Sequence, residues 1–253
     1  PNGSYQVLAQ RGTSTGVNGT LFDTAFAGVS HQTTSLNSSG FAAFQATLAA
    51  GDVVGTTNNF ASFVGQAGAP LQMIIRKGQL VPVTGGGTCE VGFVGFNLML
   101  NAAGMVLHDE RFNSTGGTTP ATTTTDSVLM IWQPGGPNQI IMREGDPAPL
   151  PTGTGNYGSP SISQGFGATG GCAFGTTLLG GTVTTADDNA IFVGGPNGFT
   201  LLHREGTPAP GLPGVLMGTA NFTNSYSDFE GGAVAFYCVL TDAGAGVTTA
   251  NDQ

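Results

Sequence analysis

The residues best suited to chemistry are carboxylates and amides that precede an apolar run late in the chain. Asp187, Asp188 and Asn189 are adjacent there, and related stretches carry Asn58-Asn59, Asp126 and Asn251-Asp252. Carboxylate and amide oxygens on a loop suit Ca²⁺, which takes about six to eight oxygen ligands. Calcium is therefore the one cofactor that the sequence suggests, although such residues are also ordinary in turns. The predicted ligands are Asp187, Asp188, Asn189, Asn251 and Asp252.

Two patterns that can mark an active site are explained here by composition. Residues 12–16 match GxSxG, but a nucleophile elbow needs a strand-to-helix turn with distant Asp and His partners. GxGxxG occurs at residues 153–158 and 165–170, with no predicted helix after it to receive a pyrophosphate. The sequence thus predicts no catalytic residue and no enzyme.

The histidines also lack a pattern with chemical meaning. His31, His108 and His203 do not lie at matching positions, and their spacing does not suggest zinc. His108, Asp109 and Glu110 form a polar cluster at a place where related stretches carry Phe. We interpret this cluster as a local departure from the pattern.

Composition narrows the classes of function. Only 8% of the residues are charged, against roughly 25% in ordinary soluble domains. The net charge of −9 leaves no basic patch for nucleic acid, and no apolar run reaches the ~18 residues of a membrane helix. Ser, Thr, Asn and Gly supply the polar surface instead, as is common in exported β-proteins, so we predict an extracellular protein. The pairing of Cys89, Cys172 and Cys238 is left open.

An internal sequence repeat predicts the strands and turns that position all these residues. Residues 201–210, LLHREGTPAP, recur at 140–149, at 73–82 and, most faintly, at 7–13. The recurring turn residues are Arg76, Arg143, Arg204, Gly78, Gly145 and Gly206. We predict one repeat domain over 1–253, with units at about 12–77, 78–144, 145–205, and 206–253 plus 1–11. Repetition favours a structural task for the arginines, such as bridging turn carbonyls or a carboxylate; a ligand clamp is the alternative.

Each repeat reads as four short antiparallel strands between turn clusters, with very little helix. In the third repeat the strands are expected near 157–163, 170–178, 190–193 and 199–203. Four strands repeated radially at about 65 residues predict an all-β, four-bladed β-propeller rather than a solenoid.

The two ends of the chain are out of phase with the repeat. Residues 247–253 match 183–189, and residues 1–4 match 196–199, so Tyr5–Ala9 is expected to complete the last blade, which then lacks one strand. Either the chain is a fragment, or another copy supplies the strand and builds a filament. The predicted assembly edges are Pro1, Tyr5, Val7, Ala250, Asp252 and Gln253.

Residues 37–44, NSSGFAAF, fit an NxxGxxAF pattern, which later repeats keep only in part. With the REGxPAP turn, this resembles the NxxGxxAF tandem-repeat family of exported, surface-anchored bacterial proteins. The resemblance implies an extracellular or cell-surface location and carries no activity with it. Glycosylation is then plausible at the sequons of Asn2, Asn18, Asn37, Asn113 and Asn221.

These observations rank three functions. The first is an extracellular structural or interaction protein that assembles with copies of itself into a filament by strand complementation. The second is a surface module that binds a glycan or another ligand through propeller loops. A hydrolase comes third.

Overall fold

The structure is a computed structural model that describes residues 7–23, 35–162, 165–228, 233–242 and 247. Its described residues form antiparallel β-strands and no helix, which confirms the all-β prediction. The chain divides into two compact units, 1–140 and 141–253, which are described separately. The prediction of a single repeat domain is not tested by this division.

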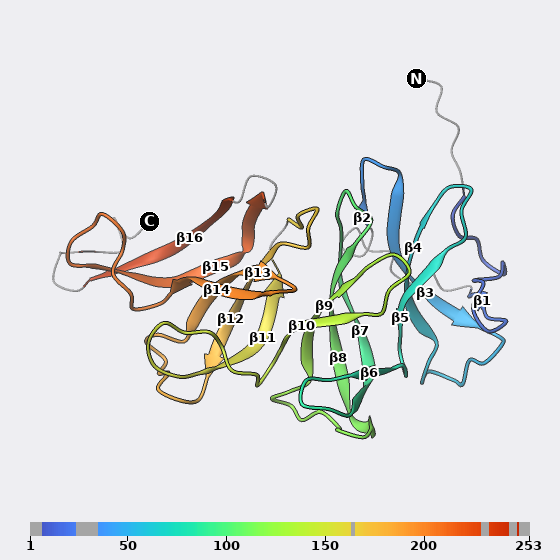
Figure 1. Cartoon of the computed structure of the whole chain (residues 1–253), viewed down its shortest axis with the longest axis horizontal. Helices are drawn as coiled ribbons and strands as arrows, with labels where there is room; N and C mark the ends of the chain where they lie inside the picture. Colours follow the sequence, from blue (N-terminus) through green and yellow to red (C-terminus); the bar gives the residue numbers. More distant parts are fainter. Residues whose placement is uncertain (1–6, 24–34, 163–164, 229–232, 243–246, 248–253) are drawn as a thin grey trace. The chain divides into compact units, whose positions relative to one another are not determined.

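The first sheet of the first unit has its edge strand in two pieces. β3 (Phe41–Ala49) pairs near one end with β1 (Leu21–Phe22) and near the other with β2 (Ser35–Leu36). The meander continues through β4 (Phe60–Gln66) and β5 (Gln72–Arg76), as Figure 1 shows. Four strand positions are therefore filled in this sheet, the first of them by two short strands.

The second sheet has five strands in the order β10-β9-β8-β7-β6. A short strand, β6 (Leu80–Pro82), precedes the long strands β7 (Thr88–Leu100) and β8 (Val106–Gly117). β9 (Ser127–Trp132) and β10 (Gln139–Arg143) complete it. The length of β7 and β8 was not expected from the sequence, because glycines divide their apolar runs.

The second unit contains a four-stranded sheet and a hairpin. The sheet order is β11 (Asn156–Ile162), β12 (Cys172–Leu179), β13 (Asn189–Gly195) and β14 (Gly198–Arg204), close to the predicted strands. The hairpin consists of β15 (Val215–Asp228) and β16 (Ala233–Asp242). Within the described residues, β16 has no neighbour on its other edge.

The expected N-terminal strand at Tyr5–Ala9 does not form in its described part. Residues 7–9 are not in a strand, and the side chain of Val7 is 77% exposed. A strand is stable where its backbone N–H and C=O groups find partners, and residues 7–9 pair with no described strand.

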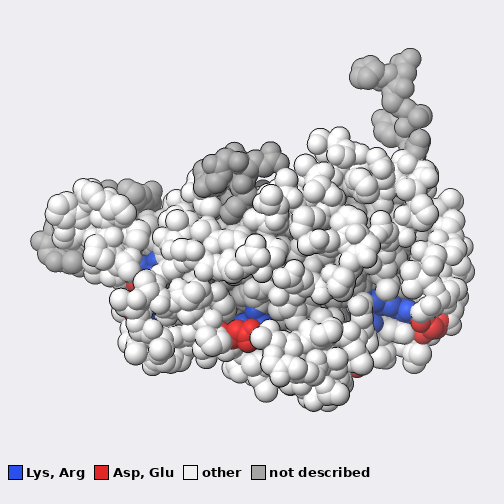
Figure 2. Space-filling view, in the orientation of Figure 1, with Lys and Arg blue, Asp and Glu red and all other residues white. Residues whose placement is uncertain are grey.

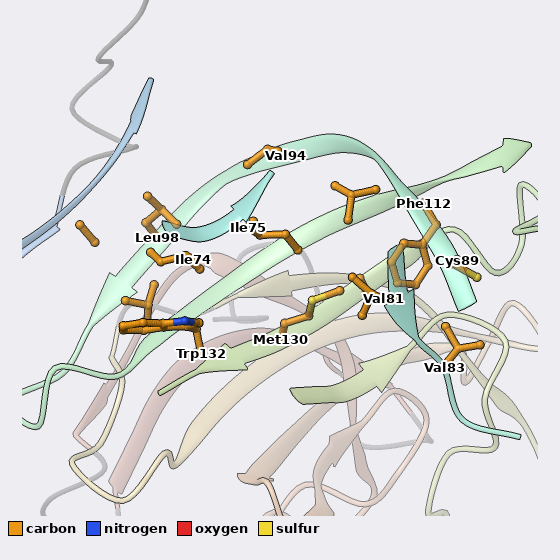
Figure 3. Packing of buried hydrophobic residues seen from close by; sticks show 14 of the residues in the cluster. Ile74, Ile75, Val81, Val83, Cys89, Val94, Leu98, Phe112, Met130 and Trp132 are labelled. Atoms are coloured by element: carbon orange, nitrogen blue, oxygen red, sulfur yellow. The ribbon is translucent and has the colours of Figure 1, made fainter. Parts of the chain in front are cut away.

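The core of the first unit lies between the faces of its two sheets. Figure 3 shows Ile74 and Ile75 of β5 packed with residues of the second sheet, such as Met130 and Trp132 of β9, while β7 curves across them. All six residues of β9 are buried, and every second one, Val128, Met130 and Trp132, belongs to this cluster, as expected for a strand with a period of two.

Aromatic triads recur in the core at equivalent places of the first and third repeats. In the first, Phe63 stacks on Phe44 with ring centroids 5.8 Å apart and meets the edge of Phe22 at 5.3 Å. In the third repeat, the corresponding distances are 5.6 and 5.1 Å. The residues of this second triad are Tyr157, Phe174 and Phe192. The two triads lie about 130 residues apart in the sequence and have nearly the same ring distances.

Candidate functional site

The turn at the centre of each sequence repeat has one geometry in all four copies. The fourth residue donates its N–H to the carbonyl of the first, and the third is a glycine with φ between +75° and +85°, as a type II turn requires. The glycine N–H then donates to a carbonyl of the strand region that follows it in the same unit, at 2.7 or 2.8 Å. The glycines are Gly12, Gly78, Gly145 and Gly206. In the faintest copy Gln10 takes the arginine's place and Arg11 follows it.

The recurring arginines hold the loop before the third strand of their own repeat. Nε of Arg76 donates to the carbonyl of Asn58 at 2.6 Å, and Nε of Arg204 donates to the carbonyl of Asp187 at 2.8 Å. Each also forms an ion pair, Arg76 with Asp52 at 2.7 Å and Arg204 with Asp187 at 2.5 Å. Arg143 is buried as well. These contacts favour the structural alternative over a ligand clamp.

Replacing Arg204 with Met should lower the free energy of unfolding by about 2 kcal/mol, because a buried carbonyl and a carboxylate lose charged donors. Urea denaturation measures the change. Arg11→Met is the matched control, since Arg11 is exposed in the equivalent turn, and it should change stability by less than about 0.5 kcal/mol. Equal losses of stability in both variants would argue against a stabilising role for the contacts of Arg204.

Two of the predicted calcium ligands, Asp187 and Asn189, have hydrogen-bond partners for their side-chain oxygens. Oδ1 of Asp187 accepts from the N–H and hydroxyl of Thr184 at 2.7 and 2.9 Å, and its Oδ2 faces Arg204. The Thr184 backbone N–H, first among several contacts, lowers the pKa of Asp187. Oδ1 of Asn189 accepts from the N–H of Ala220. Among the described residues no three His, Cys, Asp or Glu side chains group as metal ligands; Asn251 and Asp252 lie outside them, so the calcium site stays a prediction.

The other predicted sites are placed only in part. The amide nitrogens of the described sequon residues donate hydrogen bonds, Asn18 to Asp52 and Asn113 to Glu90. Asn2 and the side chain of Asn221 lie outside the described structure. The same holds for the assembly edges Pro1, Tyr5, Ala250, Asp252 and Gln253.

Asn37, the remaining sequon residue, organises a turn and joins two repeats. Its Oδ1 accepts from the N–H groups of Ser39 and Phe41, and Asn101 accepts from Met105 in the same way. The Nδ2 of Asn37 also donates to the carbonyl of Asn101 at 2.8 Å. The asparagine of the NxxG pattern thus links equivalent turns 64 residues apart.

The feature that sequence reasoning undervalued is a buried polar network around His108 in β8. Nδ1 of His108 lies 2.7 Å from Oε1 of Glu110, and both side chains are 0% exposed. Nε2 of His108 lies 2.9 Å from Oδ1 of Asn138, whose Nδ2 donates to the carbonyl of Ile74 at 2.6 Å. Oε2 of Glu110 accepts from the N–H of Gly95 at 3.0 Å. Burial raises the pKa of Glu110 to about 7.

This network crosses between the two sheets of the first unit. Ile74 belongs to β5 of the first sheet, and Gln45 of β3 donates to the carbonyl of Gly95 in β7. Gln45 also contacts the Ser62 hydroxyl at 3.4 Å, while its buried Oε1 has no hydrogen-bond partner among the described residues. A continuous chain of polar groups therefore joins the first and second repeats.

The same positions are mainly apolar in the neighbouring repeats. The residue at the place of His108 is Phe44 in the first repeat and Phe174 in the third. Asn138 precedes Arg143 by five residues, as Phe199 precedes Arg204, and Phe199 contacts Phe174 at 4.9 Å. The departure noted in the sequence is therefore a coordinated exchange of apolar groups for hydrogen-bonded ones.

A wide bulge in β7 supports the network. Residues 95–97 of β7 lie opposite the single residue Asp109 of β8. The N–H and side chain of Asn97 donate to the carboxylate of Asp109 at 3.1 and 3.2 Å. A Cβ on Gly95 would lie 1.9 Å from the carbonyl oxygen of Asp109, so only glycine fits. The bulge borders a depression of about 510 Å³, lined also by Phe93 and Arg111.

His203 and the cysteines have quieter surroundings, and His31 lies outside the described residues. His203 is buried, its ring lies 5.3 Å from that of Phe236, and burial lowers its pKa. All three cysteines are free, which answers the question that the sequence left open. Cys89 and Cys172 are buried, and burial raises the pKa of Cys172 to about 12, so that thiol is unreactive.

The surface carries little charge, as the composition predicted. Figure 2 shows few Lys, Arg, Asp and Glu side chains on the face drawn. Among the described residues, no helix is long and apolar enough to cross a membrane.

One family model matches the chain, over residues 1–253, and it describes a family of unknown function, DUF7453. No curated protein and no solved structure matches the chain. The resemblance to the NxxGxxAF repeat family is not tested by this match and stays a prediction.

Proposed function

The chain belongs to DUF7453, a family of unknown function, and we propose its role from its own geometry. We propose an extracellular structural and interaction protein, built as a four-bladed propeller, that assembles by strand addition at β16. The observation that carries the proposal is the edge of β16, which has no neighbour among the described residues. No catalytic step is part of the proposal. The low charge and the exported-repeat resemblance support the extracellular location.

Propeller geometry is supported by the repeated contacts. The four turns share one hydrogen-bond scheme, and the triads of the first and third repeats share one ring geometry. Within the first unit, equivalent turns are joined through Asn37 and Asn101. Sheets that pack face to face through repeated contacts of this kind are typical of propeller blades.

The other repeats indicate which residues a strand that pairs with the β16 edge should carry. In each of them an N–H of the second strand donates to the carbonyl of an Asx residue just before the third strand or at its start: Leu48 to Asn59, Phe112 to Asp126, Leu178 to Asp188. A large apolar side chain follows four residues after that Asx, and it is Phe63, Met130 or Phe192. We expect Leu240 to be the corresponding donor in β16, and the incoming strand to carry the same Asx and apolar residues.

Strand addition supplies main-chain hydrogen bonds for affinity and side-chain pockets for specificity. The exposed side chains of β16 include Tyr237 at 53% and Val239 at 43%. An exposed apolar edge strand is a ready template for pairing unless it is covered. We therefore propose that an extended segment of another copy covers it.

The first experiment is electron microscopy of the full chain at near-physiological salt, with light scattering to measure mass. Regular filaments support the proposal, and a monomer of one chain mass argues against it. A parallel sample with chelator tests the calcium prediction. Filaments that disperse on chelation and re-form with added Ca²⁺ would place the ion in the assembly.

Lysine at both Tyr237 and Val239 should weaken association about tenfold per lysine, or about 1.4 kcal/mol each, because charge on an edge strand opposes pairing. Sedimentation at several protein concentrations measures the shift. Val54→Lys is the control, since Val54 is 67% exposed and belongs to the first unit, whereas β16 belongs to the second. Equal weakening by the control would place the contact elsewhere.

A second candidate function is a surface module for a neutral, hydroxyl-rich ligand. The observation that favours it is a depression of about 340 Å³ in the second unit, lined by hydroxyl and amide groups. They include Ser159, Ser161, Thr177, Asn189 and Thr219. Binding of the full chain to a glycan array tests this function, and a glycan-binding monomer would favour it over assembly.

A further inference from the structure

The hydrogen-bond partners around His108 determine where protons must lie. The carbonyl of Ile74 only accepts, so the Asn138 atom facing it at 2.6 Å is the donating Nδ2. The Oδ1 of Asn138 then faces Nε2 of His108 at 2.9 Å. Because this oxygen only accepts, Nε2 must carry a proton.

The same argument applies from the other end of the hydrogen-bond network. The N–H of Gly95 only donates, so Oε2 of Glu110 accepts and carries no proton. The remaining contact is the 2.7 Å pair of Nδ1 of His108 and Oε1 of Glu110. One proton must lie between these two atoms, whichever of them holds it.

Removal of that proton is costly at this place. Two lone pairs would face each other at 2.7 Å between side chains that are 0% exposed. Rotating the ring does not help. Its one N–H would then face Glu110, and the nitrogen without a hydrogen would face Oδ1 of Asn138, which only accepts. The network holds together only in its protonated form.

We propose that the His108–Glu110 pair is a proton-dependent latch between the first and second repeats. With its proton the pair holds the His108 ring that fastens β5 to β8 through Asn138, and without it Nδ1 of His108 and Oε1 of Glu110 repel each other and the ring loses that anchor. The charged, titratable group beside the pair is Asp109, whose charge disfavours ionisation of Glu110. Its carboxylate is bound by Asn97 on the bulge. From the first sheet the pair's network meets Gln45 and Ser62, which are neutral.

The folded network holds one proton between Nδ1 of His108 and Oε1 of Glu110, and burial raises the pKa of Glu110 to about 7. In the unfolded chain the matching proton belongs to an ordinary histidine, whose pKa is about 6.5. The stability that the network contributes is therefore present just below about pH 6.5 and is lost as the pH rises above it. The folding equilibrium constant should fall by up to about tenfold per pH unit in that range.

Glu110→Gln tests the latch in the full chain. The amide can donate to Nδ1 of His108 and accept from Gly95, so it imitates the protonated carboxyl at every pH. Urea denaturation from pH 4.5 to 8 should show that this variant loses the fall in stability seen in the parent. Glu90→Gln on β7 is the matched control, and it should keep the fall.

Nitrogen NMR of the histidine rings gives an independent result, with the His108 signals assigned by their loss in His108→Gln. Nε2 of His108 should carry a proton from pH 5 to 7. A neutral ring with its proton on Nδ1 would overturn the proposal. Equal pH dependence of stability in the parent and Glu110→Gln would overturn it as well.

Discussion

Phenylalanine at position 108, the residue that the neighbouring repeats carry there, should destabilise the protein by about 3 kcal/mol. The substitution removes the partner of Glu110, whose side chain is 0% exposed, and one partner of Asn138. A buried group that loses its partner bears its full desolvation cost. Urea denaturation at pH 6 measures the loss, because the parent network holds its proton there.

Exchange of the whole network should restore most of that loss. The variant His108→Phe, Glu110→Ala, Asn138→Leu reproduces the residues of the first repeat, Phe44, Ala46 and Leu71. It leaves no buried charge, and apolar replacement of a buried polar pair is often neutral or stabilising. Three single variants compared with the triple one measure the coupling. Additive losses in the triple variant would contradict a connected network.

Phe63→Ala should lower the free energy of unfolding by about 4 kcal/mol, and Phe192→Ala should have a similar effect in the other unit. Each ring is fully buried at the centre of an aromatic triad, and the triads have nearly equal ring distances. Removing such a ring leaves a cavity that a β-sheet core fills poorly.

Chemical denaturation of the two variants measures both losses. Val54→Ala serves as the control, since Val54 lies 67% exposed, and it should cost less than about 0.5 kcal/mol. A much smaller loss at Phe192 than at Phe63 would show that the third repeat does not depend on its triad as the first does.

The two sets of variants examine one principle of this molecule. Equivalent positions in the repeats are filled either by stacked rings or by a hydrogen-bonded network, and both fillings support the same sheet. Phe44 and Phe174 belong to the first kind, and His108 belongs to the second. A repeat protein can therefore change the chemistry of one repeat while keeping the backbone of the others.

The sequence by itself determined the local structure. A glycine two residues after each recurring arginine predicts a turn that needs positive φ, and Gly78, Gly145 and Gly206 adopt it. Alternating apolar residues predicted the strands of the third repeat within a few residues of their observed bounds. These signals act between residues close in the chain, so they can be read without knowledge of the fold.

Only the tertiary structure decided what the polar side chains do. His108 and Glu110 are two residues apart on a strand, a spacing that says nothing about burial, and their partners Gly95, Asn138 and Ile74 come from other strands and loops. Asp187 is predicted from the sequence to bind an ion, and the ion pair that the fold gives it with Arg204 could not be predicted there. Both outcomes depend on which side chains meet across sheets, because desolvation and hydrogen bonding are set by neighbours in space and not by neighbours in the chain.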